Sequence, residues 1–210
     1  MNLKVKTFIC GPLKNNVYVV FDDQTRVALI IDPSLDLEPV THFIQQQSLA
    51  PESILITHAH FDHFYGVPYL QQTFPAIKNV YLHSGDLTLW RNGGGMPEFL
   101  GKPLVVQDPN CLIAHGQTIQ FGGHTIEIRH APGHSLGSVI YYFQELATVF
   151  CGDVIFFHSI GRTDLADGNH SELINSIQGQ ILSLPPETHL LSGHGPATTV
   201  AEEKANNPFL

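Results

Sequence analysis

The sequence contains few cysteines, few basic side chains and no long apolar run. Its three cysteines are widely spaced and form no Cys-x-x-Cys pair, so a disulfide framework is not expected. A reducing, cytoplasmic location is expected instead. Ten Lys and Arg against 19 Asp and Glu give a net charge of −9, which disfavours nucleic acid as a partner because phosphate binding requires basic clusters. No segment has the length and apolarity of a membrane span, and the N-terminus lacks the apolar core of a signal peptide.

Histidine, by contrast, is abundant. The chain has 13 histidines, more than its ten Lys and Arg together, and metal binding would account for part of that excess. Its 210 residues, 43% of them hydrophobic, are enough for a single domain over residues 1–210 with a sizeable core. With nucleic acid and membrane disfavoured, the expected partner is a small-molecule substrate, and the chain could be a monomer or a homodimer.

One short segment concentrates metal-binding side chains. The apolar residues 54–56 are typical of a buried strand, and His58-Ala59-His60-Phe61-Asp62-His63 follows directly. Imidazole and carboxylate groups are ligands for zinc, iron and related cations. The first two histidines project from the same side of an extended segment, with Asp62 and His63 just beyond. The segment could therefore serve two neighbouring metal positions, whereas packing four such side chains without solvent or metal would be costly.

The wider pattern is that of an α/β protein, because strands followed by helices imply sheets covered by helices. Alternating or continuous apolar runs predict strands, and apolar residues at helical spacing predict helices. The strands are expected at residues 3–9, 17–21, 27–31, 54–56, 79–82, 118–121, 124–130, 138–143, 148–151 and 189–191, and the helices at 36–47, 68–73 and from the N-cap Asn169 to about 182.

The stretch 91–110 is the least regular part of the chain. It contains a glycine triplet but not the spaced pattern of a phosphate-binding loop. Such a segment is typical of a surface loop or a lid beside a substrate cleft. Arg91, Met96 and Phe99 are therefore possible substrate contacts.

Three later motifs complete a known signature. His134 lies in Pro-Gly-His-Ser, Asp153 in Cys-Gly-Asp and His194 in Ser-Gly-His-Gly. Together with the segment 58–63, in this order, they resemble the metallo-β-lactamase superfamily over most of the chain. The resemblance implies a four-layer αβ/βα sandwich built from two similar halves.

The resemblance also implies a dinuclear centre. His58, His60 and His134 would hold one metal, Asp62, His63 and His194 the other, and Asp153 would bridge them. Two Zn²⁺ ions are expected, with Fe or Mn possible at either position. The cations would lower the pKa of a bridging water to about 7, and the resulting hydroxide would attack a carbonyl. Asp62 and Asp153 are the expected catalytic carboxylates. A serine hydrolase is disfavoured, because Ser135 lies in no G-x-S-x-G elbow.

Residues 161–164 (Gly-Arg-Thr-Asp) and the tail 184–210 are similar to small bacterial glyoxalase II-like hydrolases. This similarity implies hydrolysis of a thioester such as an S-(2-hydroxyacyl)glutathione-type compound, although the C-terminal glutathione-binding helical region is expected to be absent. Gly-Arg-Thr-Asp also resembles persulfide dioxygenases, so a mononuclear iron enzyme of that type is the alternative. A third possibility is a metal-binding protein without catalysis. β-Lactamase activity is disfavoured, because that group usually has a different ligand set and a periplasmic signal.

Some roles remain open from the sequence. Arg162 could recognise a substrate carboxylate or could pair with Asp164. Asp32 could support the metal-binding segment or could be a turn residue before a proline. His158 and His170 flank the loop after Asp153 and could contribute to the site.

Overall fold

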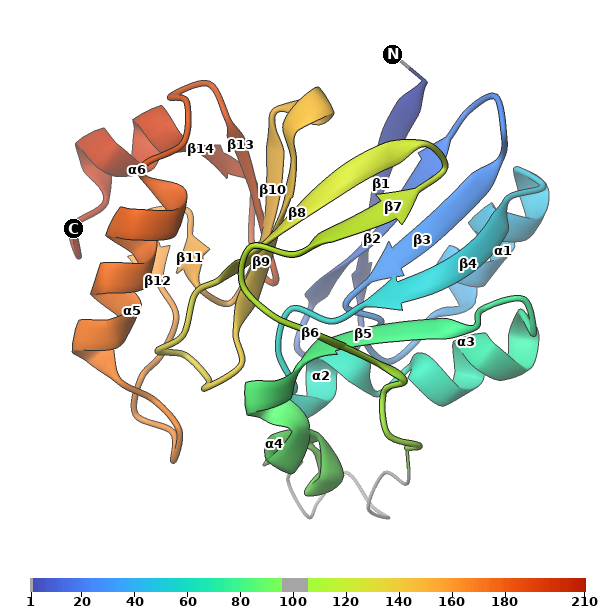
Figure 1. Cartoon of the computed structure of the whole chain (residues 1–210), viewed down its shortest axis with the longest axis horizontal. Coiled ribbons are helices and arrows are strands. Elements are labelled where there is room, and N and C mark those ends of the chain that lie inside the picture. The colour runs from blue at the N-terminus through green and yellow to red at the C-terminus, as the bar shows by residue number, and fades with distance from the viewer. Residues whose placement is uncertain (1, 96–105) are drawn as a thin grey trace.

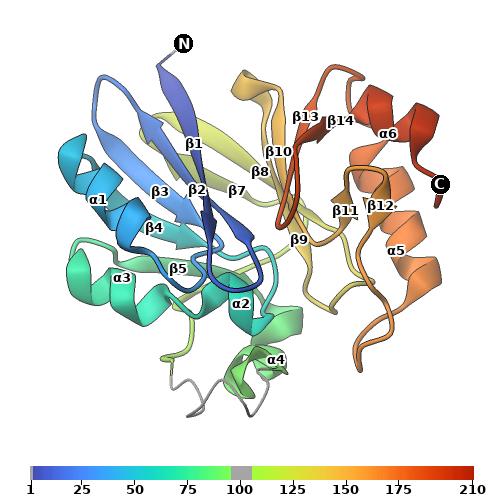
Figure 2. The same ribbon diagram turned by 180° about the vertical axis from the view of Figure 1, so that it is seen from behind.

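The computed structural model describes residues 2–95 and 106–210. Two six-stranded β-sheets pack face to face, and helices cover the outer face of each (Figures 1 and 2). The expected four-layer αβ/βα sandwich is confirmed. The expected contacts Met96 and Phe99 lie outside the described residues. No helix in the described ranges has the length and apolarity to cross a bilayer.

The first sheet has the order β1-β2-β3-β4-β5-β6. Its first three strands are antiparallel, and β3 to β6 run parallel. The strands are β1 (Leu3–Cys10), β2 (Asn15–Asp22), β3 (Val27–Ile31), β4 (Ala50–Leu55), β5 (Asn79–His83) and β6 (Cys111–Ile113).

The second sheet has the order β14-β13-β10-β9-β8-β7. It is antiparallel apart from the pairing of β10 with β13. Its strands are β7 (Thr118–Phe121), β8 (His124–His130), β9 (Val139–Phe143), β10 (Thr148–Gly152), β13 (His189–Ser192) and β14 (Thr198–Thr199), and a separate hairpin joins β11 (Ile155–Phe156) to β12 (Ser159–Ile160).

The helices form the two outer layers. Helices α1 and α3 lie on the first sheet, and α5 and α6 lie on the second (Figure 2). Two short helices, α2 and α4, lie near the end of the first sheet where β4 leads into the segment 58–63. The bounds are α1 (Glu38–Gln46), α2 (Phe61–Phe64), α3 (Val67–Thr73), α4 (Leu87–Arg91), α5 (His170–Ser176) and α6 (Val200–Asn206).

The sheets and helices enclose three apolar clusters, and the side chains of strand β2 take part in two of them. Its side chains alternate: Val17 and Val19 pack in the cluster beneath α1 and α3, whereas Tyr18 and Val20 pack between the sheets. A strand buried on both faces reads as a continuous apolar run, because neither face meets water. A third cluster fills the space between the second sheet and α5.

Three local features differ from the sequence expectation or refine it. Strand β4 begins at Ala50 rather than 54, because Pro51 is accommodated beside a register shift in the pairing with β3. The expected helix after Asn169 changes at Ile177 from α to a π-helical turn over Ile177–Ile181. The N-cap is confirmed, since the Asn169 side chain accepts a hydrogen bond from the Glu172 amide.

Candidate metal centre

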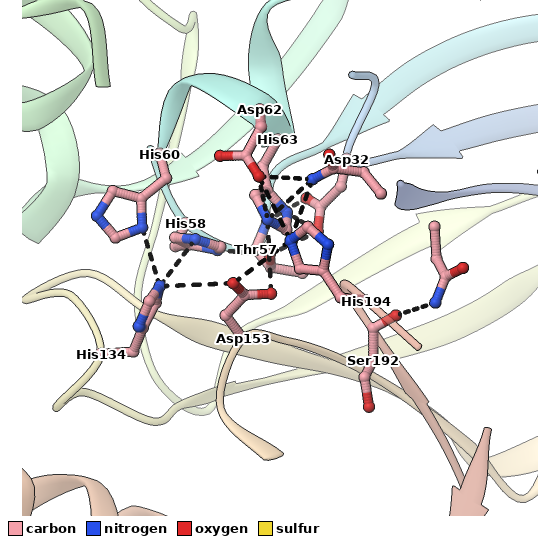
Figure 3. A network of polar contacts seen from close by, with 12 residues as sticks. Asp32, Thr57, His58, His60, Asp62, His63, His134, Asp153, Ser192 and His194 are labelled. Carbon is pink, nitrogen blue, oxygen red and sulfur yellow. Dashed lines mark hydrogen bonds and ion pairs between the residues drawn. The ribbon is translucent and has the colours of Figure 1, made fainter. Parts of the chain in front are cut away.

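The seven expected ligands lie together at one edge of the two sheets (Figure 3). The segment 58–63 follows β4, and His134 lies between β8 and β9. Asp153 follows β10 and His194 follows β13, the two parallel strands of the second sheet. Parallel strands end at the same edge of a sheet, so these loops converge by topology. Each sheet therefore supplies one side of the site.

The first triad is formed by three imidazoles. The Nε2 atom of His134 lies 3.2 Å from Nε2 of His58 and 2.9 Å from Nδ1 of His60. The ligand atoms of the three side chains all lie within 4.8 Å of one another. Three nitrogen donors at this spacing suit a cation such as Zn²⁺ or Fe²⁺.

The second triad has one carboxylate and two imidazoles. Oδ2 of Asp62 lies 3.6 Å from Nε2 of His63 and 3.4 Å from Nε2 of His194. Asp62 and His63 are buried, and His194 is partly exposed, so this triad faces the solvent at one side. The mixed donor set also fits a divalent cation.

Asp153 lies between the two triads (Figure 3). Its Oδ1 is 3.5 Å from Nε2 of His63, and its Oδ2 is 3.8 Å from His134 and 3.7 Å from His194. Oδ1 is buried and has no hydrogen-bond partner among the described residues. An unpaired buried carboxylate oxygen is costly, and a cation on either side would remove that cost.

In three of the site histidines the outer ring nitrogen is hydrogen-bonded to an oxygen acceptor. Nδ1 of His134 donates to the Arg162 carbonyl oxygen, Nδ1 of His194 to the Leu13 carbonyl and Nδ1 of His63 to Asp32. When such a ring is neutral, donation through Nδ1 leaves a lone pair on Nε2, and the Nε2 atoms of these three rings face the site. This arrangement is typical of metal-bound histidines, so the residues present fit two bound cations.

Asp32 supports the site, which resolves one of the open alternatives. Its Oδ1 accepts from the Thr57 amide and its Oδ2 from the Thr57 hydroxyl, 2.8 and 2.6 Å away. The same hydroxyl lies 3.1 Å from Nδ1 of His58. Because the hydroxyl donates to Asp32, its lone pair accepts from that ring. One buried carboxylate thus orients His58 and His63, one from each triad.

Asp86 is a supporting residue that the sequence did not indicate. Its buried carboxylate accepts from the amides of Ala59 and Gly137, at 2.8 and 2.5 Å, and from the Ser135 hydroxyl, at 2.8 Å. Ala59 separates the first two histidine ligands, and Ser135 follows His134. Asp86 therefore ties together the two loops that hold the first triad, and Ser135 serves this network rather than acting as a nucleophile.

Asn15 begins β2, and its side chain contacts the site. Its Nδ2 donates to Oδ2 of Asp62 at 2.8 Å and lies 3.3 Å from Nε2 of His63. The side chain is fully buried. Asn15 lies in no sequence motif that could have indicated this role.

Burial lowers the pKa of two histidines in the first triad. Burial and the neighbouring imidazoles His63 and His134 hold the pKa of His58 well below its usual value. Burial, followed by the effect of His134, lowers the pKa of His60 to about 4. Both rings are therefore neutral at physiological pH, which is the form that binds a metal.

In the second triad the pKa shifts of His63 and Asp62 favour the charged forms instead of the neutral ones. Burial opposes the charge on His63, but the carboxylates of Asp153, Asp62 and Asp32 outweigh it and raise the pKa of His63 to about 10. Burial likewise opposes the charge on Asp62, but His63 and hydrogen bonds from His194 and Asn15 hold the Asp62 pKa well below its usual range. A cation at this triad must therefore displace a proton from His63.

A cleft with two lobes opens on the site. The larger lobe, about 600 Å³, contacts ligands of both triads, and a smaller lobe of about 420 Å³ lies beside the β11–β12 hairpin. Asp153, Arg162 and His194 border both lobes. A substrate bound at the ligands thus has room for an arm on either side.

The remaining expected residues lie elsewhere or pair with neighbours. Arg162 forms a bidentate pair with Asp164, with both N–O distances 2.7 Å. His158 pairs with Glu202 of α6 at 2.7 Å, which ties the β11–β12 hairpin to that helix. Arg91 pairs with Asp108 and borders neither lobe, and neither does the exposed His170.

Comparison with known proteins agrees with this geometry. The model of the "Metallo-beta-lactamase superfamily" matches residues 10–194. The chain therefore belongs to the metallo-β-lactamase superfamily and is a metal-dependent hydrolase of that superfamily.

The chain is similar to several named proteins over almost its whole length. The chain is 37% identical to the "Probable metallo-hydrolase YqgX" of Bacillus subtilis, over 99% of this chain and 98% of that protein. It is 31% identical to "Hydroxyacylglutathione hydrolase GloC" of Haemophilus influenzae, over 94% of this chain and 93% of that protein. Among solved structures, BLEG-1, titled a B3 metallo-beta-lactamase, superposes with a TM-score of 0.92 at 40% identity over 99% of both chains. TTHA1623, titled as a di-iron-bound form, superposes with a TM-score of 0.83 at 36% identity, over 98% of this chain and 100% of that chain.

Proposed function

We propose that this protein is a dinuclear zinc hydrolase that cleaves acyl thioesters of the S-(2-hydroxyacyl)thiol class. The observation that carries the proposal is the pair of complete triads joined by Asp153. Similarity to the hydroxyacylglutathione hydrolase GloC supports the thioester class. Two zinc ions held there would supply hydroxide at neutral pH and polarise the substrate carbonyl.

The chain's own residues position the reaction. In the first triad His58 and His60 present neutral imidazoles, and the second triad provides a carboxylate, Asp62, beside His194 at the solvent side. In this proposal the two lobes of the cleft would accept the acyl and thiol arms, and the scissile bond would lie beside Asp153, which lines both lobes. Holding the reacting carbonyl in one orientation is itself a large part of catalysis.

The test replaces the bridging carboxylate. Asp153→Ala is expected to abolish thioester hydrolysis and to lower zinc content together, because it removes the group shared by both triads. Asp108→Ala, which removes an exposed carboxylate outside the cleft, is the control. Zinc per chain is measured by mass spectrometry and thiol release by a colorimetric assay. Full activity of Asp153→Ala would refute the assignment.

The alternative is a mononuclear iron enzyme of the persulfide dioxygenase type. The first triad and Asp153 supply enough ligands for one iron. Similarity to TTHA1623, whose structure is titled a di-iron-bound form, supports testing iron as the metal. One iron per chain, with oxygen uptake on addition of glutathione persulfide, would favour this alternative. Two zinc ions per chain and no oxygen uptake would exclude it.

Similarity to BLEG-1 adds β-lactams to the substrates that must be assayed. The thioester proposal predicts that kcat/KM for a lactoyl thioester exceeds that for a chromogenic cephalosporin. The opposite order would assign this chain to β-lactam hydrolysis.

A further inference from the structure

The larger lobe of the cleft has an apolar wall. Away from the metal ligands, its side chains come from the β1–β2 turn, from α2 and α4 and from the loop after Arg162. The apolar residues among them are Pro12, Leu13, Phe61, Leu89, Leu165 and Ala166. Leu13 is half exposed, so it offers apolar surface to an occupant of the cleft.

Away from the metal ligands, this wall carries one basic and one acidic side chain. The loop 162–167 carries one cation, Arg162, and two carboxylates, Asp164 and Asp167. Arg162 and Asp167 line the larger lobe, and Arg162 also lines the smaller one. Among the described residues that line either lobe, Arg162 is the only Lys or Arg.

Asp164 occupies the guanidinium of that single cation. Its Oδ1 and Oδ2 accept from Nε and Nη2 of Arg162, both at 2.7 Å. These two parallel bonds use one edge of the guanidinium, through Nε and Nη2, and pair its charge with a carboxylate. Asp164 itself lines neither lobe, so it acts on the cleft through Arg162.

We infer that Asp164 sets the charge preference of this cleft. By neutralising Arg162 it reserves the apolar lobe for an uncharged acyl or thiol arm and disfavours an anionic one. The inference rests on the proposed thioester hydrolysis and narrows it. Glutathione has two carboxylates and one ammonium group, so a glutathione thioester is expected to be a poorer substrate than the same acyl group on a short, uncharged thiol.

The experiment compares two thioesters of equal chain length on the zinc-loaded protein. Hexanoyl and adipoyl thioesters of N-acetylcysteamine differ only in a terminal carboxylate. Wild type is expected to prefer the hexanoyl compound at least tenfold in kcat/KM. Asp164→Ala should shift that ratio about tenfold toward the adipoyl compound, because one charge is freed a few ångströms from the carboxylate.

Asp167→Ala is the matched control. It also removes one carboxylate from the same loop, but it leaves the Arg162–Asp164 pair intact, so its shift should be clearly smaller. In the double variant Arg162→Gln/Asp164→Ala the ratio should return toward the wild-type value. Equal use of both thioesters by wild type, or equal shifts for Asp164→Ala and Asp167→Ala, would overturn the inference.

Binding separates this inference from the proposed reaction. The corresponding S-hexyl and S-(5-carboxypentyl) thioethers cannot be hydrolysed, and their Kd values can be measured by calorimetry with each zinc-loaded variant. A carboxylate that contacts zinc does so in every variant, so only the change between variants counts. If no thioester is cleaved, the proposed function fails. The inference on charge preference still stands if the Kd ratio shifts in Asp164→Ala alone, and fails if it does not.

Discussion

Replacing Asp86 tests how much of the site depends on one buried carboxylate outside the ligand set. Asp86→Ala would leave three buried donors without their acceptor: the amides of Ala59 and Gly137 and the hydroxyl of Ser135. Each unsatisfied buried donor costs about 1–3 kcal/mol, so the three together cost about 3–9 kcal/mol. Burial raises the pKa of Asp86, which shows that ionising it there has a cost of its own, and removing that cost offsets part of the loss. We expect a net loss of about 3–4 kcal/mol.

Ser135→Ala is the matched control, because it removes one donor and leaves the other two satisfied. It should lower the free energy of unfolding by about 1 kcal/mol. Urea unfolding of both metal-free variants measures the difference. Zinc affinity, measured by competition with a chromophoric chelator, should fall about 10–100-fold in Asp86→Ala, as is typical for groups that orient metal ligands. If Asp86→Ala is no less stable than Ser135→Ala and binds zinc as wild type does, the supporting role assigned to Asp86 is wrong.

Three further predictions concern protons and space. Because the His63 pKa lies near 10 without metal, zinc binding at neutral pH should release about one proton from that ring. Zinc affinity should therefore rise with pH until His63 is neutral. Calorimetry in buffers of different ionisation enthalpy counts the released protons, and no release would contradict the assignment. Glu145 and Asp22 outweigh burial and raise the pKa of His124. The stabilisation from charged His124 is therefore complete below the unfolded pKa of about 6.5 and is lost as the pH rises through the folded pKa. The urea midpoint of wild type should exceed that of His124→Gln by more at pH 6 than at pH 8, and an equal difference at both would refute this. A Cβ on Gly193 would lie 2.3 Å from Oδ1 of Asp153, so Gly193→Ala should lower zinc content while every ligand remains; full zinc occupancy would show that the loop adapts.

The sequence predicted the parts of the fold that depend on local patterns. Strand β2 could be recognised because its residues are apolar on both faces, and the start of α5 because Asn169 is an effective N-cap. Strand β4 was placed too late, since Pro51 argues locally against a strand and only the bulge in the pairing with β3 permits it. Strand β6 was not expected, because three residues are too few to show a period.

The same division applies to the site. The ligand candidates could be proposed because they form motifs, and the structure places all seven within one cluster. Asp86 and Asn15 could not be proposed, because each contacts the site across a long stretch of chain and neither lies in a recognisable motif. Arg162 was ambiguous in the sequence for a physical reason: a guanidinium pairs equally well with a substrate carboxylate or with a neighbouring aspartate, and only the geometry showed that Asp164 occupies it.

The split origin of the ligands has a consequence for biosynthesis. The first sheet carries His58 to His63, whereas His134, Asp153 and His194 belong to the second, and the last of them follows β13. While the chain is being synthesised, the first half can present only part of each triad. The second triad and its bridging carboxylate become complete only after residue 194 has left the ribosome and β13 has paired with β10. Metal uptake at full affinity is therefore a late event in the life of the nascent chain, because a product that terminates before β13 lacks His194 and cannot complete the second triad.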